Sequence, residues 1–337
     1  MQRFGIDVAK HSRRVIALIG GVALAFVTMA HLAGTAWAAS YPTRPVKIIV
    51  PYGAGGIADV TMRMVAEKLS KKLGQQFIID NRPGAAGIIG IKAAVTSSPD
   101  GYTLAMIGGG LTAAKALFKS LPYDLESDLI PISTTAFYGL VVATKADSPL
   151  KSAKDVIEAA KASPGKLNFG AINPGSNQHL SAELFKSLAG ISVTAIPYKT
   201  TPELLTATIR GDIDILFEYQ AALQGPLSDR KIVAIATTGR ERSPSLPDVP
   251  TVAESGLPDY EVTSWNALAA PAATPAEIVT MLNGAVNEAL NSPDIKAAMI
   301  KFGMDARGSS VEDLRERIKQ EVVKWAKVIE TAGIEKK

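Results

Sequence analysis

The chain of 337 residues contains no cysteine and only three histidines. The absence of cysteine excludes disulfide bonds, thiolate metal sites and cysteine nucleophiles. Two of the three histidines precede residue 38, so His179 is the only one in the rest of the chain. This count excludes a metal site or an acid/base centre built from several histidines. We therefore expect neither a metal nor another cofactor.

A strong charge of one sign is also missing from most of the chain. The formal net charge is +4, but residues 1–38 hold four basic residues and one acidic residue, which leaves +1 for residues 39–337. So weak a field does not attract nucleic acid or an anionic lipid surface. A segment of this length can bury a large core and divide into two domains.

Residues 1–38 have the composition of a signal peptide. An apolar stretch at 15–29 precedes the small-x-small sequence Ala36-Trp37-Ala38, and the basic residues before it are Arg3, Lys10, Arg13 and Arg14. The apolar stretch is short for a membrane span, which needs about 20 residues. We expect cleavage near Ala38 and export to the periplasm; a retained membrane anchor is the alternative. The paired arginines loosely resemble a twin-arginine signal, which leaves the export route open.

Two glycine-rich loops follow predicted strands near the start of the expected mature chain. Residues 46–50 form an apolar β-branched run, followed by a loop with three glycines and a helix that begins near Ile57. Residues 77–80, the loop 81–87 and a helix from Ile88 repeat this order. Glycine lets the backbone approach a ligand, and free N–H groups at a helix start point toward it. The two loops should therefore share one edge of a parallel sheet and bind a polar or anionic ligand.

Strands and helices alternate along the rest of the chain, which predicts an α/β fold with parallel sheets. Two lobes are expected, with the chain crossing near Val142 and returning near Val262, and with the C-terminal helices packed on the first lobe. Residues 121–131 are predicted to be irregular. The further predicted strands are 102–107, 138–144, 167–169, 193–197, 213–217, 232–237 and 260–269, and the helices are 59–73, 152–162, 178–188, 202–210, 275–290, 293–302 and 311–332.

The first loop also supports a different function. Gly53-x-Gly55-x-x-Ala58 followed by Asp80 fits the dinucleotide fingerprint, so a dinucleotide-binding oxidoreductase is the alternative. Pro51 and Tyr52 stand where that fingerprint expects a strand to run directly into glycine. An exported protein also has little access to nicotinamide cofactors. No nucleophile elbow surrounds Ser176, and the acidic residues show no metal-ligand spacing, so we do not expect an enzyme.

Several polar side chains have both a structural and a functional interpretation. Asp59, in the first turn of a predicted helix, either stabilises the positive helix end or accepts a hydrogen bond from a ligand. Arg82 could bind a ligand carboxylate, but pairing with Asp80 is favoured. His179 either donates to a ligand or makes a structural hydrogen bond. Trp265 is either a wall of the cleft or part of the core.

Several motifs distributed from Tyr41 to the C-terminal helix occur together. They are Tyr41-Pro42-x-Arg44-Pro45-Val46, Gly55-Gly56-x-x-Asp59, Asn81-Arg82-Pro83-Gly84-Ala85, Pro99-Asp100-Gly101-Tyr102-Thr103-Leu104, His179-Leu180-x-x-Glu183-Leu184-Phe185, Pro197-Tyr198-Lys199, Gly211-x-Ile213-Asp214-x-x-Phe217 and Leu246-Pro247-Asp248-Val249-Pro250-Thr251-Val252-Ala253-Glu254. Jointly they resemble the Bug (TctC-type) family, the periplasmic solute-binding proteins of tripartite tricarboxylate transporters. This resemblance covers the mature chain, whereas the dinucleotide interpretation depends on one loop.

The resemblance implies a two-lobed Venus-flytrap fold in which each lobe is a mainly parallel sheet flanked by helices. Lobe 1 would comprise residues 39–142 and 263–337, and lobe 2 residues 143–262. Such a protein captures a small carboxylate between its lobes and delivers it to membrane subunits of a tripartite tricarboxylate transporter. We expect a monomer that does not bind nucleic acid.

The resemblance also implies which residues bind the ligand. Backbone groups and bridging waters of the first two loops would hold one carboxylate, and the second lobe would contact the other end of the ligand. The residues carried over are Tyr52, Gly53, Ala54, Gly55, Gly56, Ala58 and Asp59, then Pro83, Gly84, Ala85, Ala86, Gly87 and Ile88, and in the second lobe Asn173, Gly175, Ser176, Asn177, His179, Tyr198, Lys199, Thr200 and Glu218.

The chain departs from the common family pattern at three of these positions. Ala58 stands where threonine or serine is frequent, Ile88 where asparagine is frequent, and Glu218 where aspartate is frequent. The first two changes remove polar groups from the expected first-lobe site. They favour an aromatic or aliphatic mono- or dicarboxylate over an amino acid as the ligand.

Overall fold

The computed structural model describes residues 41–172 and 175–336. The chain divides into two units after Thr43. Of the first unit only Tyr41, Pro42 and Thr43 are described, so the predicted signal peptide lies outside the described residues. Everything below concerns the second unit. No helix among the residues described is both long and apolar enough to cross a membrane.

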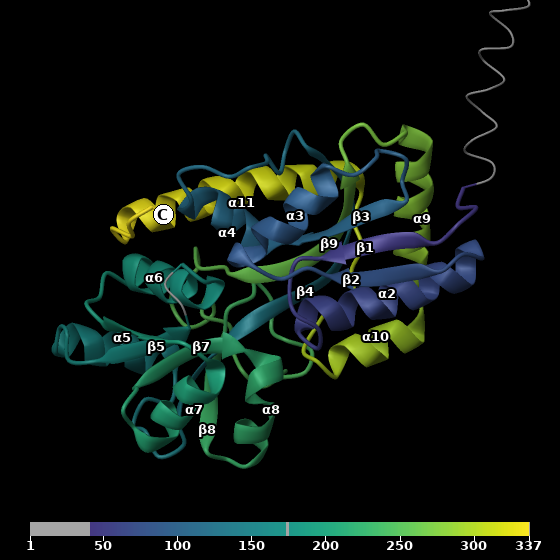
Figure 1. The fold of residues 1–337 in the computed structure, drawn as a ribbon. Helices are drawn as coiled ribbons and strands as arrows, with labels where there is room; N and C mark the ends of the chain where they lie inside the picture. The colour runs from purple at the N-terminus through teal and green to yellow at the C-terminus, as the bar shows by residue number, and fades with distance from the viewer. Residues whose placement is uncertain (1–40, 173–174, 337) are drawn as a thin grey trace, which may run out of the picture. The chain divides into compact units, whose positions relative to one another are not determined.

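Within residues 41–172 and 175–336, nine strands form one curled sheet in the order β2-β1-β3-β9-β4-β7-β5-β6, with β8 paired to β4. Their bounds are β1 Val46–Val50, β2 Phe77–Asn81, β3 Thr103–Gly108, β4 Leu129–Lys145, β5 Asn168–Ile172, β6 Thr194–Tyr198, β7 Ile215–Tyr219, β8 Ile232–Thr237 and β9 Thr263–Pro271. Strand β4 runs from one half of the sheet into the other (Figure 1). Its first part, Leu129–Gly139, pairs with β9, and its last part, Leu140–Lys145, pairs with β7 and β8.

The predicted parallel pairing is confirmed in both halves. Strands β2, β1 and β3 are parallel in the first half, and β6, β5 and β7 are parallel in the second. Strands β4, β8 and β9 add antiparallel pairs between and beside these groups. Because β4 carries the chain out of the first half and β9 brings it back, the two strands necessarily run in opposite directions. We call the halves the first and second lobe.

Helices cover both faces of each lobe (Figure 1). In the first lobe, α2 (Ile57–Leu73), α9 (Ala276–Asn291) and α10 (Pro293–Ile300) lie on one face, and α3 (Ile88–Val95) and α4 (Gly109–Leu117) on the other. In the second lobe, α5 (Ala153–Ala162) and α6 (Asn177–Ala189) oppose α7 (Thr201–Arg210) and α8 (Gln220–Ser228). Alternate strand residues face opposite helices, so both faces of the strands are apolar.

The last helix, α11 (Val311–Thr331), belongs to both cores. Leu314 and Ile318 pack in the first-lobe cluster with Ile49 and Ile107. Trp325 and the turn after it pack in the second-lobe cluster that contains Phe169. Of the C-terminal helices, α9 packs on α2 and β4 and α10 packs on α9, whereas α11 contacts both cores.

Three elements differ from the sequence prediction. Strand β4 begins at Leu129, within a segment expected to be irregular, because pairing with β9 supplies hydrogen bonds that no local pattern reveals. Helices α4 and α8 were not predicted. Three consecutive glycines precede or open α4, and α8 contains Gly225 and Pro226. Both residue types disfavour helices locally, so tertiary packing of Leu111 and Leu223 outweighs the propensity.

Candidate functional site

A cavity of about 420 Å³ lies between the two lobes, and we call it the cleft cavity. It is lined by Gly55, Gly56, Ile57, Val60, Ile172, Gln178, Thr201, Glu218, Tyr219, Ala221, Ala222, Gln224, Phe302 and Met304. Three of the predicted ligand-binding residues, Gly55, Gly56 and Glu218, are among them. The cavity lies at the carboxyl ends of β1, β5 and β7, where parallel α/β sheets usually bind ligands.

The first turns of four helices line this cavity. They contribute Ile57 of α2, Gln178 of α6, Thr201 of α7 and Ala221 of α8. Neither α2 nor α8 has a side-chain cap on its first N–H groups. Helix starts carry partial positive charge, and their N–H groups bind anions. The helix starts therefore favour a ligand with at least one negative group. Glu218, the only charged side chain among the described lining residues, opposes a second negative group beside it while it is ionised.

Asp59 holds the first loop in place. Its side chain accepts hydrogen bonds from the Gly55 backbone N–H (2.9 Å), from Arg63 Nε (2.9 Å) and from Asn81 Nδ2 (3.0 Å). Asn81 Nδ2 also donates to the Tyr52 carbonyl, so the second strand fixes the first loop. Burial acts to raise the pKa of Asp59, but the three hydrogen bonds outweigh it and lower the pKa below the usual value. The geometry supports the structural interpretation of Asp59.

The other predicted residues of the first loop surround this clamp. Gly53 and Ala54 are exposed, and Ala58 is buried. Tyr52 is directed toward α4, where its hydroxyl lies 3.0 Å from the position that a Cβ on Gly110 would take. Burial raises the pKa of the Tyr52 hydroxyl, so the phenol is neutral.

The second loop has an unusual backbone. Gly84, Ala85, Ala86 and Gly87 have φ angles of 132°, 46°, 56° and 95° in succession. Positive φ is unfavourable for alanine, and such strain persists only where the surroundings impose it. Gly87 is buried against Pro51 and Leu111, which joins the second loop to the first. Pro83 is exposed and Ile88 is partly buried beside the first-lobe core. Arg82 pairs with Asp80 at 2.9 Å, as predicted.

Glu218 lies at the end of β7, with only 2% of its surface exposed. Its carboxylate accepts hydrogen bonds from Gln178 Nε2 (3.0 Å), Thr201 Oγ1 (2.8 Å) and the Tyr219 backbone N–H (2.7 Å). Burial raises the pKa of Glu218, and the three hydrogen bonds oppose this rise only in part. Gln178 and Thr201 are each one residue from a predicted position, so the sequence motifs located the loops but not the side chains that face the cavity.

The other residues predicted in the loop before α6 have structural partners. The Ser176 hydroxyl caps α6 by accepting from the His179 N–H, and it donates to the Ile172 carbonyl. His179 Nδ1 accepts from the Gly175 N–H at 3.3 Å. Burial lowers the pKa of His179, so the ring is neutral near pH 7 and makes a structural hydrogen bond. Asn173 lies outside the described residues.

A set of polar side chains joins the two lobes beside the cleft. Asn177 Nδ2 donates to Ser264 Oγ (3.0 Å) and to the Tyr219 hydroxyl (3.3 Å), and Tyr219 also contacts Ser264 (3.0 Å). The ring of Tyr138 packs edge-on against Tyr219, with centroids 5.4 Å apart. Trp265 is fully buried core, and its Nε1 donates to Glu321 at 2.7 Å.

The remaining predicted residues follow β6. Tyr198 is partly buried, Lys199 and Thr200 are exposed, and Thr200 caps α7 by accepting from the Glu203 N–H. Thr201, the next residue, is the one that reaches Glu218.

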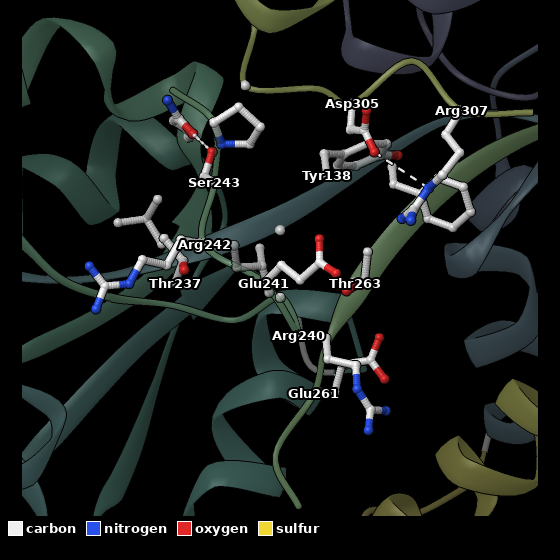
Figure 2. Close-up of a pocket in the computed structure, with 18 of the residues that line it drawn as sticks. Tyr138, Thr237, Arg240, Glu241, Arg242, Ser243, Glu261, Thr263, Asp305 and Arg307 are labelled. Carbon is white, nitrogen blue, oxygen red and sulfur yellow. Dashed lines mark hydrogen bonds and ion pairs between the residues drawn. The ribbon is translucent and has the colours of Figure 1, made fainter. Parts of the chain in front are cut away.

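A second cavity, of about 240 Å³, lies where β4 passes between the lobes, and we call it the hinge cavity (Figure 2). Residues 137–141 of β4 and the segment 239–244 after β8 line it. Several of its charged side chains are paired: Arg307 with Asp305 (3.4 Å) and Arg242 with Glu254 (2.9 Å). These two arginines are therefore already engaged by carboxylates of the protein itself.

A sequence model described as the tripartite tricarboxylate transporter family receptor matches residues 61–334. The chain belongs to this receptor family. It is 34% identical to Protein BugT of Bordetella pertussis over 322 residues, which cover 95% of this chain and 98% of the relative. It is 31% identical to a UPF0065 protein from the tcbD-tcbE intergenic region of Pseudomonas sp. strain P51, over 96% of this chain and 95% of the relative.

Solved structures of solute-binding receptors are similar to this fold. Rpa4515 of R. palustris, solved with adipate, is 35% identical, with a TM-score of 0.75 over 87% of this chain and 98% of that protein. MatC of Rhodopseudomonas palustris, with bound malate, is 29% identical, with a TM-score of 0.71 over 86% of this chain and all of that protein. The periplasmic binding protein BugD is 29% identical, with a TM-score of 0.72 over 88% of this chain.

Membership of this receptor family confirms the predicted two-lobed binding-protein fold and the resemblance drawn from the motifs. It also overturns the dinucleotide interpretation of the first loop. Asp80, which would have to bind a ribose, is instead paired with Arg82 at 2.9 Å and lies 3.6 Å from Lys47. The glycine loop that resembled a fingerprint is the first loop of a periplasmic solute-binding receptor.

Proposed function

We propose that this protein is a periplasmic receptor that binds a small aromatic or aliphatic carboxylate reversibly, without chemical conversion, and presents it to the membrane subunits of a tripartite tricarboxylate transporter. In this proposal the lobes are those expected from the sequence, 39–142 with 263–337 and 143–262. The receptor acts as a monomer, and its cleft opens and closes around the ligand.

One observation carries the proposal: four helix starts and a single buried carboxylate line the same cavity. The ligand carboxylate binds to the backbone N–H groups that follow Gly55, at the start of α2, because the Gly55 N–H itself is bound to Asp59. The start of α2 has no side-chain cap and favours negative charge. The second loop, residues 83–88 of the same lobe, also belongs to this carboxylate site in the proposal, although none of these residues lines the cleft cavity. The far end of the ligand meets Glu218, Gln178 and Thr201. Adipate and malate in the solved relatives support a carboxylate as the ligand class.

Isothermal titration against a panel of mono- and dicarboxylates tests this function. We expect saturable binding of at least one carboxylate with one site per chain, no product by mass spectrometry after prolonged incubation, and no binding of a nicotinamide nucleotide. Tight binding of the nucleotide without binding of any carboxylate would return the oxidoreductase as the better function. Conversion of a bound acid into a new compound would make the protein an enzyme.

The raised pKa of Glu218 predicts pH-dependent binding. When the pH falls toward this raised value, Glu218 takes up a proton, its repulsion of a ligand carboxylate disappears, and the side chain becomes a hydrogen-bond donor. Affinity for dicarboxylates should therefore rise as the pH falls from about 7.5 toward the raised pKa of Glu218, by up to about tenfold for one pK unit of coupling. Titrations across this range with one dicarboxylate measure the effect.

The matched variant is Glu218→Gln, which keeps the shape of the side chain and replaces the titrating carboxyl group with an amide that stays neutral. Its affinity for dicarboxylates should be high and nearly constant over the same pH range. If Glu218→Gln retained the pH dependence of the wild type, Glu218 would not be the group that contacts the ligand.

Export is the remaining part of the proposal. The basic, apolar and small-residue order of residues 1–38 predicts cleavage near Ala38. Mass spectrometry of periplasmic material should find an N-terminus at or near Ala39. An intact chain retained in the inner membrane would contradict the predicted cleavage and release.

A further inference from the structure

A short segment after α10 separates the cleft cavity from the hinge cavity. Phe302 and Met304 line the cleft cavity, whereas Gly303 and Asp305 line the hinge cavity. We call residues 302–305 the wall segment. The Lys301 carbonyl, just before it, accepts from Gln224 Nε2 of the second lobe at 2.6 Å. Its other end pairs with β4 of the first lobe through two backbone hydrogen bonds between Asp305 and Phe137, of 2.9 and 2.7 Å.

The conformation of the wall segment depends on Gly303. Its φ of +71° is unfavourable for other residues, and a Cβ at this position would lie 2.7 Å from Gln220 Oε1. Gln220 cannot easily yield, because Ser243 and Ser245 hydrogen-bond to it at 3.2 and 3.0 Å. The segment is therefore held at both ends and in its middle, and this fixes where Phe302 and Met304 meet the cleft.

The two apolar side chains of the wall segment differ in their freedom. Met304 is 1% exposed, and its sulfur accepts a hydrogen bond from Thr61 Oγ1 at 3.2 Å. Phe302 borders the cavity, and 39% of its surface is exposed. Met304 is already packed by the protein, whereas Phe302 has surface left for a ligand. Burial of that surface on binding would contribute to affinity.

The wall segment completes an apolar zone between the two polar ends of the cavity. The other members are Ile57 and Val60 from α2, and Ala221 and Ala222 from α8. A ligand that spans from Gly55 to Glu218 must place its body against this zone. Methylene or aromatic C–H groups gain binding free energy there because their apolar surface is buried. A hydroxyl group would lose its hydrogen bonds to water and find no hydrogen-bond partner among these six side chains.

Building on the proposed receptor function, we propose that Phe302 and the wall segment determine which carboxylates this protein accepts. They select ligands with an unsubstituted methylene chain or an aromatic ring between the carboxylate and the far end. Short hydroxylated acids are disfavoured. The sequence motifs of the family loops did not include this segment, which reaches the cleft from the C-terminal part of the chain.

The test is a titration series of straight α,ω-dicarboxylates with four to eight carbons, together with terephthalate and malate. Wild-type affinity should rise by up to about fourfold for each added methylene until the zone is filled. Malate should bind more weakly than succinate, from which it differs by one hydroxyl. Phe302→Ser should weaken binding of the longest accepted dicarboxylate and of terephthalate by about tenfold, while its effect on succinate stays within about twofold.

Ile300→Ser is the matched control. Ile300 is the last residue of α10 and is 41% exposed, close to the 39% of Phe302, but it does not line the cleft cavity. Ile300→Ser should leave the affinities for the whole series unchanged. Phe302→Leu should retain most of the chain-length dependence of the wild type. A chain-length dependence unchanged in folded Phe302→Ser, or malate binding more tightly than succinate, would overturn this selectivity and leave the receptor function standing. If folded wild-type protein bound no carboxylate in the series, the proposed function itself would be wrong.

Discussion

Substitution of Gly55 by valine should lower affinity for every accepted carboxylate by about thirtyfold or more, which corresponds to the loss of one or two charge-assisted hydrogen bonds, about 2 kcal/mol. Gly55 has a φ of +83° and lines the cleft cavity. Valine is strained at this φ, so the loop must change its path where backbone N–H groups should meet the ligand. Calorimetric titration of three chemically different carboxylates measures whether the losses are parallel.

Gly74→Val is the matched control at the opposite end of the same helix. Gly74 caps the C-terminus of α2 with a φ of +70°, and a Cβ at either glycine meets nothing within 4 Å. Both variants carry similar backbone strain, but only Gly55 borders the cavity. Gly74→Val should lose stability and keep its affinity. If circular dichroism showed a folded Gly55→Val that bound carboxylates normally, the first loop would not carry the affinity.

Gly84→Val extends this comparison to the second loop. Gly84 has a φ of +132°, and a Cβ there would lie 2.5 Å from Ile89 Cδ1. Valine must therefore displace Ile89 as well as strain the backbone. We expect the same parallel loss for all carboxylates. A change that affected only one ligand would place selectivity, rather than general carboxylate binding, in this loop.

Replacement of Asp59 by asparagine should destabilise the protein by about 2 kcal/mol at neutral pH and weaken carboxylate binding by about tenfold. The Gly55 N–H and Asn81 lose a charged acceptor that is almost fully buried. Arg63 contributes less, because its side chain is 54% exposed and solvent screens the ion pair. Urea denaturation and titration with one dicarboxylate measure the two effects separately.

The pH dependence of this variant follows from the lowered pKa of Asp59. A carboxylate with a lowered pKa contributes stability above the pKa of the unfolded state, about 3.9, and loses it as the pH falls through the value of the folded state. The difference between wild type and Asp59→Asn should therefore be full at about pH 7 and shrink below about pH 4. A difference that stayed constant into strong acid would show that the charge of Asp59 is not responsible.

Asp155→Asn is the control for Asp59. Asp155 lies in the first turn of α5 and accepts from the backbone N–H four residues earlier, Lys151, at 2.9 Å, the same arrangement as Asp59 with Gly55. It stands on a partly exposed helix start and does not line the cleft cavity. Carboxylate affinity should be unchanged in Asp155→Asn. A loss equal to that of Asp59→Asn would point to a general effect of helix capping.

The sequence alone determined the α/β order and the two glycine loops, because both depend on residues that are close together in the chain. Apolar strand runs and glycine turns act over five to ten residues, and they predicted β1, β2, α2 and the second loop near their observed positions. Glu218 was predicted for the same reason: it is the penultimate residue of β7, at the edge where parallel sheets usually bind ligands, and it lines the cleft cavity. The pairing of Arg82 with Asp80 was also local and correctly predicted.

The tertiary structure decided which side chains face the cleft. Gln178 and Thr201 are each one position away from a predicted residue. Because a helix turns about 100° per residue, side chains one position apart point in different directions. Helix α8 was not predicted because Gly225 and Pro226 disfavour a helix. It forms because Leu223 packs into the second-lobe core. Phe302 and Met304 lie more than 240 residues from Gly55 in the chain, and only the return of β9 and the packing of α9 and α10 bring them to the same cavity. No local pattern specifies such a juxtaposition, because it results from the pairing of β4 with β9 and from burial on both faces of the sheet.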